Sequence, residues 1–113
     1  MTTITIIDEY LRTSVNPLDW KAVYVNQERD SISVEIRAFS SDHWVEKAIT
    51  LLANNECPVV KIDCSFDERC LPYLDRFVGR VHHLLTNLPA KTEARVYVTN
   101  QSFKDALVSK LED

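Results

Sequence analysis

The residues best suited to chemistry gather at the end of one predicted strand. The mostly apolar stretch Val59–Cys64 is predicted to be a strand. At and just beyond its end the chain carries Asp63, Cys64, Ser65 and Asp67. Because α/β proteins bind ligands beyond the carboxyl ends of their parallel strands, we predict a crevice here for a small ligand or a reactive thiol. The alternative is structural: the thiol packs in the core, the first carboxylate faces solvent or pairs locally, and Ser65 or Asp67 caps the next helix.

A second candidate site lies on a long amphipathic helix further along the chain. One sector of that helix, opposite its leucine-rich stripe, carries five basic and aromatic residues: Arg69, Tyr73, Arg76, Arg80 and His83. We call this set the basic ridge. Because arginine and tyrosine are enriched at the energetic centres of protein interfaces, we predict that the ridge contacts a partner protein. Two alternatives stay open: a solvated helix face with weak ion pairs, or a ligand for phosphate.

The sequence argues against several common kinds of site. Gly79 is the only glycine, whereas loops that cradle phosphate need glycines so that the backbone can approach the ligand closely. His82 and His83 are adjacent on a helix and point about 100° apart, so they do not form a metal site. We therefore predict neither a cofactor nor a metal. The net charge of −4, without a long basic run, argues against nucleic acid as a partner.

The composition is that of one ordinary globular domain, which we place at residues 1–113. Three cysteines, Cys57, Cys64 and Cys70, cannot form a closed disulfide framework, which favours reduced thiols and a cytoplasmic location. The N-terminus lacks the features of a signal peptide, and no apolar run approaches the roughly 20 residues that span a bilayer. We expect a soluble protein with no membrane partner and, since no catalytic motif is present, not an enzyme.

Hydrophobic periodicity predicts the elements that position these residues. Strands are expected at 3–7, 21–26, 31–39, 59–64 and 94–99, and a turn of helix at 8–13. Helices are expected at 44–52 after a Ser40–Ser41 cap, at 71–88 with Pro72 in the first turn, and from a cap at Asn100 to Leu111. The segment 66–70 is expected to be an irregular turn.

Two patterns predict which side chains are buried. In 31–39, apolar residues alternate with Ser33, Glu35 and Arg37, which are expected to face solvent. The apolar stripes of the first and the long helix place three residues in the core: Trp44, Leu51 and Leu71. Trp20 either covers the core or is an exposed anchor.

The order of elements is βββαβαβα. A hairpin of the second and third strands, followed by alternating helices and strands, is typical of an α/β sandwich with a mixed central sheet and N-terminal antiparallel strands.

This order, over Lys21–Asp113, resembles the STAS family, the sulfate-transporter and anti-sigma-factor-antagonist domain. The similarity is carried by Ser31–Phe39, Trp44–Leu52, Val59–Cys64, Leu71–Leu88 and Arg95–Thr99. It implies a STAS-like sheet and a protein-binding module. STAS regulators that switch by phosphorylation present a serine at the start of the long helix, whereas residues 66–72 of this chain contain no serine or threonine. The resemblance therefore does not extend to a phosphorylation switch.

The absence of catalytic motifs, together with the basic ridge, predicts a non-catalytic regulatory or inhibitory module that binds another protein. Its partner would be a sigma-factor regulator, or a toxin if the chain is an immunity protein. Two alternatives stay open. One is a small-ligand or enzyme domain that uses the Asp63–Cys70 crevice. The other is a structural subunit that associates through an exposed edge strand, for example as a homodimer.

Overall fold

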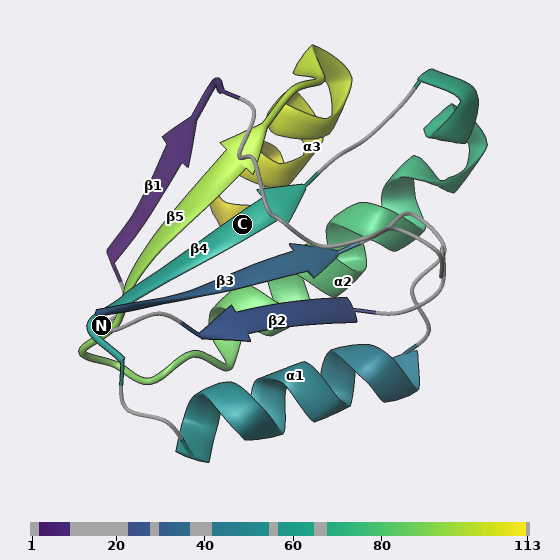
Figure 1. The fold of residues 1–113 in the computed structure, drawn as a ribbon. Helices are drawn as coiled ribbons and strands as arrows, with labels where there is room; N and C mark the ends of the chain where they lie inside the picture. The colour runs from purple at the N-terminus through teal and green to yellow at the C-terminus, as the bar shows by residue number, and fades with distance from the viewer. Residues whose placement is uncertain are drawn as a thin grey trace.

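In the computed structural model, the described residues are 3–9, 23–27, 30–36, 42–54, 57–64 and 68–112, with the backbone alone for 23–27. Within these residues, five strands form one sheet and three α-helices pack against it (Figure 1). The strands are β1 (Thr3–Ile7), β2 (Val23–Gln27), β3 (Ser31–Ile36), β4 (Val59–Cys64) and β5 (Glu93–Val98). The helices are α1 (Asp42–Asn54), α2 (Leu74–Thr86) and α3 (Gln101–Glu112), and the 3₁₀-helix η1 (Glu68–Tyr73) precedes α2.

The strands follow the order β1-β5-β4-β3-β2 across the sheet. The pairs β1–β5, β5–β4 and β4–β3 are parallel, whereas β2 pairs with β3 in the antiparallel direction at one edge. The predicted α/β class is thus confirmed. The expectation of antiparallel N-terminal strands applies to the β2–β3 pair alone, because β1 lies at the opposite edge and runs parallel to β5.

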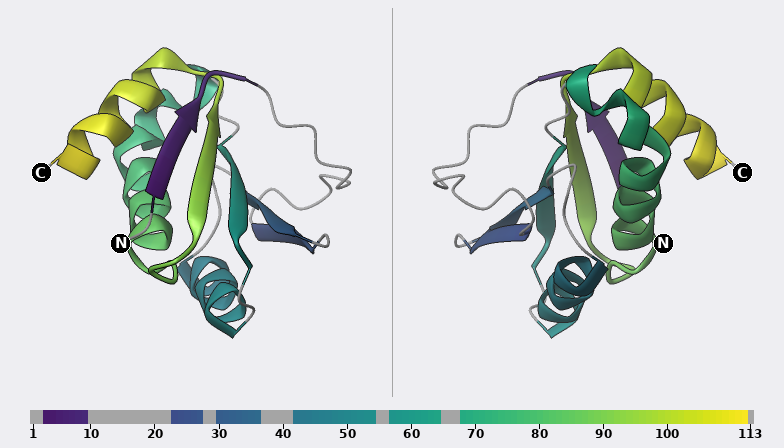
Figure 2. Two further views of the ribbon diagram at one scale, coloured as in Figure 1. Left: turned by 90° about the vertical axis from the view of Figure 1, so that its left-hand side faces the viewer. Right: turned by 90° about the vertical axis from the view of Figure 1, so that its right-hand side faces the viewer.

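The hydrophobic core lies between the sheet and the helices. Every second side chain of the central strands points into it, as Ile32, Val34 and Ile62 do without any exposure to solvent. Figure 2 shows α2 and α3 on one side of the sheet, where Phe77 and Phe103 meet with ring centroids 5.0 Å apart. Leu52 of α1 belongs to the same cluster, so all three helices bury their apolar sides against one face of the sheet.

The face of β3 that carries Ser33 and Glu35 is buried, although the alternation predicted that it faces solvent. Ser33 and Glu35 are only 6% and 5% exposed, and all six residues of β3 are buried. The prediction was wrong because alternation identifies a polar face but does not reveal what packs on it. Strands of parallel sheets are usually covered on both faces. Arg37 lies outside the described residues.

The apolar stripe of α1 is wider than the side that it buries. Val45, Ala48 and Leu52 are buried, but Trp44 and Leu51 are each 39% exposed, which corrects the prediction of a core position for both. The helix packs against α2 along one flank and contacts the edge strand β2. Because α1 stands at the margin of the helical layer, no helix among the described residues covers its other flank.

Pro72 lies inside η1 rather than in the first turn of the long helix. Proline lacks a backbone N–H and clashes with the preceding helical turn, so the chain adopts the tighter 3₁₀ geometry until Tyr73 and the α-helix begins at Leu74. Leu71 is therefore out of phase with the buried stripe of α2 and is 43% exposed, contrary to the prediction.

Several remaining predictions concern helix ends and loops. The cap of α3 is confirmed, since Oδ1 of Asn100 accepts a hydrogen bond from the backbone N–H of Phe103 at 3.0 Å. Trp20, the Ser40–Ser41 cap and residues 10–13 of the predicted N-terminal turn lie outside the described residues.

Candidate functional site

The structure divides the basic ridge into two parts. Arg69 and Tyr73 belong to η1, whereas Arg76, Arg80 and His83 follow one another on α2 at helical spacing. Arg69, Tyr73 and Arg76 are exposed, and His83 is half-exposed. Arg80 was expected on the exposed ridge as well, but it is only 7% exposed. This prediction was wrong because a helical wheel shows which residues share a side and not which neighbour that side meets.

That neighbour is α1, and two acid–base contacts join the two helices. Nε of Arg80 donates a hydrogen bond to Oδ1 of Asp42 at 3.1 Å. Nε2 of His83 contacts Oε1 of Glu46 at 2.5 Å. A carboxylate oxygen can only accept, so Nε2 of His83 is the donor to Glu46, and Nδ2 of Asn87 lies 3.3 Å from Nδ1 of the same ring. Both contacts thus present a carboxylate of α1 to a donor of α2.

A groove of about 430 Å³ runs between the two helices at this contact. Its walls are Asp42, Val45 and Glu46 of α1 and Arg76, Gly79, Arg80 and His83 of α2. Apart from Gly79, its two chain neighbours and the adjacent backbone of α2, no described atom lies within 4 Å of the position that a Cβ of residue 79 would occupy. The absence of a side chain at Gly79 therefore leaves open space in the groove.

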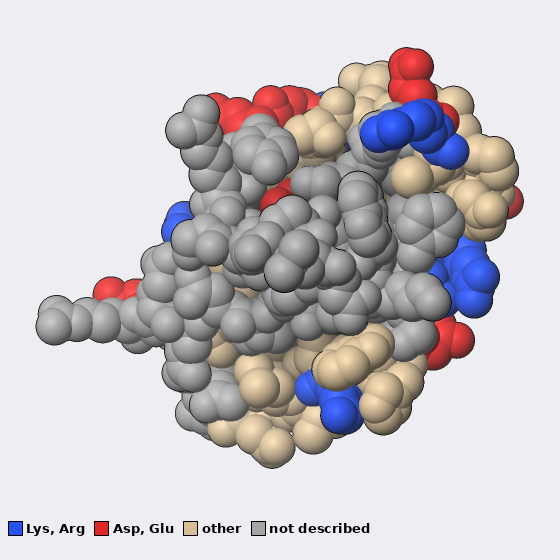
Figure 3. Space-filling view, turned by 45° about the vertical axis from the view of Figure 1, so that its right-hand side comes forward, with Lys and Arg blue, Asp and Glu red and all other residues tan. Residues whose placement is uncertain are grey.

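Arg76 stands one helical turn before Arg80 and lines the same groove, but it differs in its contacts. Among the residues that the structure describes, none forms an ion pair or hydrogen bond with its guanidinium group. Nearby on η1, Leu71 and Tyr73 are each 43% exposed. In Figure 3, basic side chains alternate with acidic ones down this side of the molecule.

Of the predicted crevice at the end of β4, the structure describes Asp63 and Cys64 alone. Asp63 and Cys64 are neighbours in a strand and therefore point to opposite faces of the sheet. Cys64 is fully buried in the apolar core, and Asp63 is 2% exposed on the other face. Burial raises the pKa of the Cys64 thiol well above its ordinary value, and the nearby Asp63 carboxylate raises it further. This opposes thiolate chemistry. Ser65 and Asp67 lie outside the described residues.

Asp63 instead belongs to a row of side chains that crosses the sheet. The register pairs Asp63 with Glu35 of β3 on one side and with Tyr97 of β5 on the other. Each of the three is the penultimate residue of its strand, so the row lies at the carboxyl ends of three parallel strands. Sequence reasoning missed Glu35 and Tyr97 because it did not establish this register. The signal that was present is a polar residue one position before each strand end.

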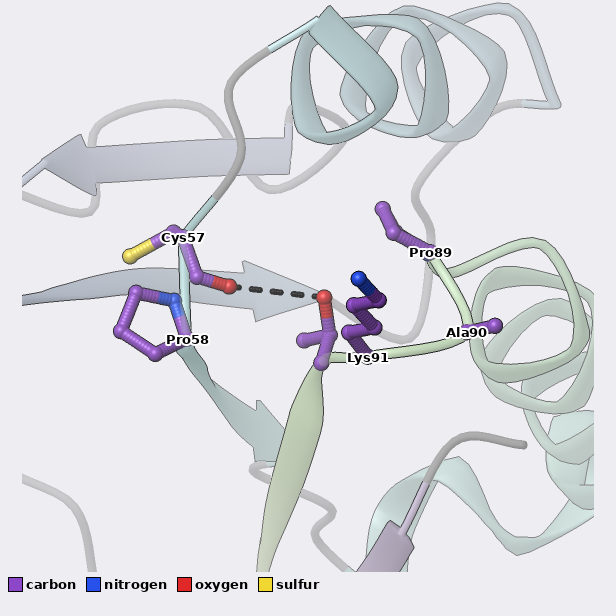
Figure 4. A pocket seen from close by; sticks show the side chains of 6 residues that line it. Cys57, Pro58, Pro89, Ala90 and Lys91 are labelled. Carbon is purple, nitrogen blue, oxygen red and sulfur yellow. Dashed lines mark hydrogen bonds between the residues drawn. The ribbon is translucent and has the colours of Figure 1, made fainter.

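A hollow of about 500 Å³ lies at the opposite end of the sheet (Figure 4). Cys57 and Pro58 form one wall, and the turn from Pro89 to Thr92 forms the other. Oγ1 of Thr92 donates to the carbonyl of Cys57 at 3.4 Å, and Sγ of Cys57 donates to the carbonyl of Val59 at 3.5 Å. These contacts join the starts of β4 and β5, so a role in the fold accounts for them.

The exposed flank of α1 forms a third surface. Nζ of Lys47 lies over the ring of Trp44, 4.9 Å from its centroid, in a cation–π contact. Leu51 follows two helical turns after Trp44 on the same flank. Because Asp42 and Glu46 bind the donors of α2, this flank and the groove lie on different sides of α1.

Comparisons with known proteins do not assign this chain to a family. No family model matches the chain, and no curated protein and no solved structure is similar to it. Among the described residues, no helix is long and apolar enough to cross a membrane. In the same residues, no group of three or more histidine, cysteine and acidic side chains is placed to hold a metal ion. The structure supports a small α/β domain whose sheet has four parallel strands.

Proposed function

We propose that the protein is a non-catalytic regulatory or inhibitory module, and that it binds a partner protein through the surface formed by η1, the start of α2 and the α1–α2 groove. We call this surface the η1–α2 surface. The observation that carries the proposal is the exposure of Leu71 and Tyr73 in η1 and of Arg76 in the first turn of α2, where Arg76 lines that groove. Large apolar, tyrosine and arginine side chains at one place are the usual composition of an interface centre.

Three further observations support this proposal. The thiol at the end of β4 is buried with a raised pKa, so it is a poor nucleophile. The STAS-like order of elements also supports a regulator that acts by binding, with a sigma-factor regulator or a toxin as the class of partner. The chain as a whole is acidic, with a net charge of −4, so a local cluster of arginines and tyrosine stands out against its surroundings.

Affinity purification from the native source tests this function. The tagged chain is expected to retain a partner protein, and the double variant Leu71→Ser, Tyr73→Ala is expected to lose it. Leu51→Ser is the matched control, because Leu51 is a leucine of similar exposure on the other flank of α1. Retention of no protein by the wild-type chain, or equal loss with Leu51→Ser, contradicts binding through the η1–α2 surface.

The row Glu35–Asp63–Tyr97 favours a second candidate function, the binding of a small ligand. Ligands of α/β proteins bind at the carboxyl ends of parallel strands, where this row lies. Thermal-shift screening with metabolites tests it. A hit that stabilises the wild-type chain and not Tyr97→Phe would support a site at this row. Equal stabilisation of both proteins, or no hit, argues against it.

A further inference from the structure

We propose that the α1–α2 groove recognises a helical segment of the partner that carries a carboxylate, which pairs with Arg76, and an apolar side chain, which occupies the space above Gly79. This inference rests on the proposed protein-binding function and specifies the chemistry of the partner.

The first argument is charge complementarity within the groove. Two of its three basic residues already contact carboxylates: Arg80 contacts Asp42, and His83 contacts Glu46. Asp42 and Glu46 are four residues apart on α1, so α2 recognises carboxylates that succeed one another on a neighbouring helix. Arg76 begins the same row and has no such contact among the described residues.

Among the described residues, α1 begins too late to supply a carboxylate to Arg76. Asp42 is the first residue of α1, and it already pairs with Arg80. A carboxylate for Arg76 would stand one turn earlier, at about residue 38, but residues 37–41 of the sequence contain no aspartate or glutamate. A helix supplied by another protein can continue the row of carboxylates beyond the N-terminus of α1.

The second argument is the space above Gly79. Glycine in the middle of a helix is unfavourable relative to other residues, and packing does not require it here, since no described atom outside the adjacent part of α2 lies within 4 Å of a Cβ at this position. What glycine provides is room between Arg76 and Arg80 in a groove of about 430 Å³. An apolar side chain of the partner fits this space, and the exposed Leu71 and Tyr73 precede the groove on η1.

The same observations favour a protein over a small phosphate ligand. The groove contains the carboxylates of Asp42 and Glu46, which repel a multiply charged anion. A single carboxylate on an apolar helix introduces less negative charge and gains contacts with the exposed side chains of η1. The carboxylate-bearing helix is therefore the occupant to which the proposal commits.

Photo-crosslinking tests the proposal in the full-length chain. Tyr73 is replaced by p-benzoylphenylalanine, which keeps an aromatic ring at that position, and the crosslinked segment is identified by mass spectrometry. The segment is expected to contain aspartate or glutamate. Arg76→Glu is expected to lower the crosslinking yield at least tenfold. Lys110→Glu, which makes the same charge change on the exposed end of α3, is expected to leave the yield unchanged.

Two further variants make the test specific to this groove. Reversing the partner's acidic residue to arginine is expected to restore crosslinking in the Arg76→Glu protein. Gly79→Leu is expected to lower the yield at least tenfold without lowering the melting temperature, because leucine fills the groove and is a better helix former than glycine.

Each contrary result has its own meaning. A crosslinked segment without an acidic residue, a second copy of this chain, or normal crosslinking by Gly79→Leu overturns the carboxylate-helix proposal. Crosslinking from p-benzoylphenylalanine at Trp44 but not at Tyr73 overturns it too, and moves the binding surface to the outer flank of α1. If neither position crosslinks a protein and affinity purification retains none, the proposed function itself fails.

Discussion

The side chain of Arg80 on α2 donates from Nε to Oδ1 of Asp42 on α1 across 3.1 Å, although the two residues differ greatly in exposure. Arg80 is 7% exposed, whereas Asp42 is 86% exposed. The guanidinium group is thus withdrawn from water, and a carboxylate from the first turn of α1 meets it. This contact fixes how the two helices that line the groove stand relative to each other.

Removal of the carboxylate is expected to destabilise the fold through Arg80. Asp42→Asn leaves a largely buried cation without its counter-charge, and we expect a loss of about 1–2 kcal/mol in the free energy of unfolding, measured with urea. In a double-mutant cycle with Arg80→Met, the second substitution should recover part of this loss. Asp105→Asn, at an exposed carboxylate of α3, is the control and should cost at most about 0.5 kcal/mol. Additive effects in the cycle would show that the contact contributes nothing.

The three cysteines are expected to differ in reactivity. Cys64 is fully buried and its pKa is raised, whereas Cys57 and Cys70 are partly exposed. With iodoacetamide at about pH 8, close to the ordinary pKa of a thiol, Cys57 and Cys70 should be alkylated at least tenfold faster than Cys64. Mass spectrometry of the peptides gives the three rates, and the difference should vanish in denaturant. Equal rates in the folded protein would contradict the burial of Cys64.

The raised pKa of Cys64 also predicts how stability changes with alkaline pH. The folded state holds the thiol protonated, so its contribution is fully present below the unfolded pKa of about 8.5. Above that pH the unfolded chain loses the proton and the folded chain does not, so stability falls as pH rises. In Cys64→Val this decline should be shallower by up to about 1.4 kcal/mol per pH unit between pH 9 and 10. Identical slopes for the two proteins would contradict it.

The contribution of the α3 cap to stability can be measured from the unfolding free energies of variants. Asn100→Ala removes the acceptor for the N–H of Phe103, and we expect a cost of about 1 kcal/mol in unfolding free energy. Asn100→Asp should retain most of the stability, because aspartate caps equally well. Ser102→Ala, an exposed change one residue before Phe103, should stay within about 0.5 kcal/mol. If Ser102→Ala costs as much as Asn100→Ala, the hydrogen bond is not the cause.

The sequence alone determined the elements whose signals are local. The strands 3–7 and 59–64 have the bounds that periodicity predicted, and the Asn100 cap lies where its residue type indicated. Such features depend on side-chain alternation and on hydrogen bonds within a few residues, so a short window of sequence contains the information.

Only the tertiary structure decided which side chains are exposed to solvent and which are buried. The exposure of Trp44 and Leu71 and the burial of Glu35 and Arg80 depend on which element lies alongside, and that neighbour is distant in the sequence. Arg80 meets Asp42 thirty-eight residues away, and Glu35 meets Asp63 through the register of two strands that α1 separates. Hydrophobic burial and ion pairing act between whatever surfaces the fold brings together, so their partners follow from topology and not from local pattern.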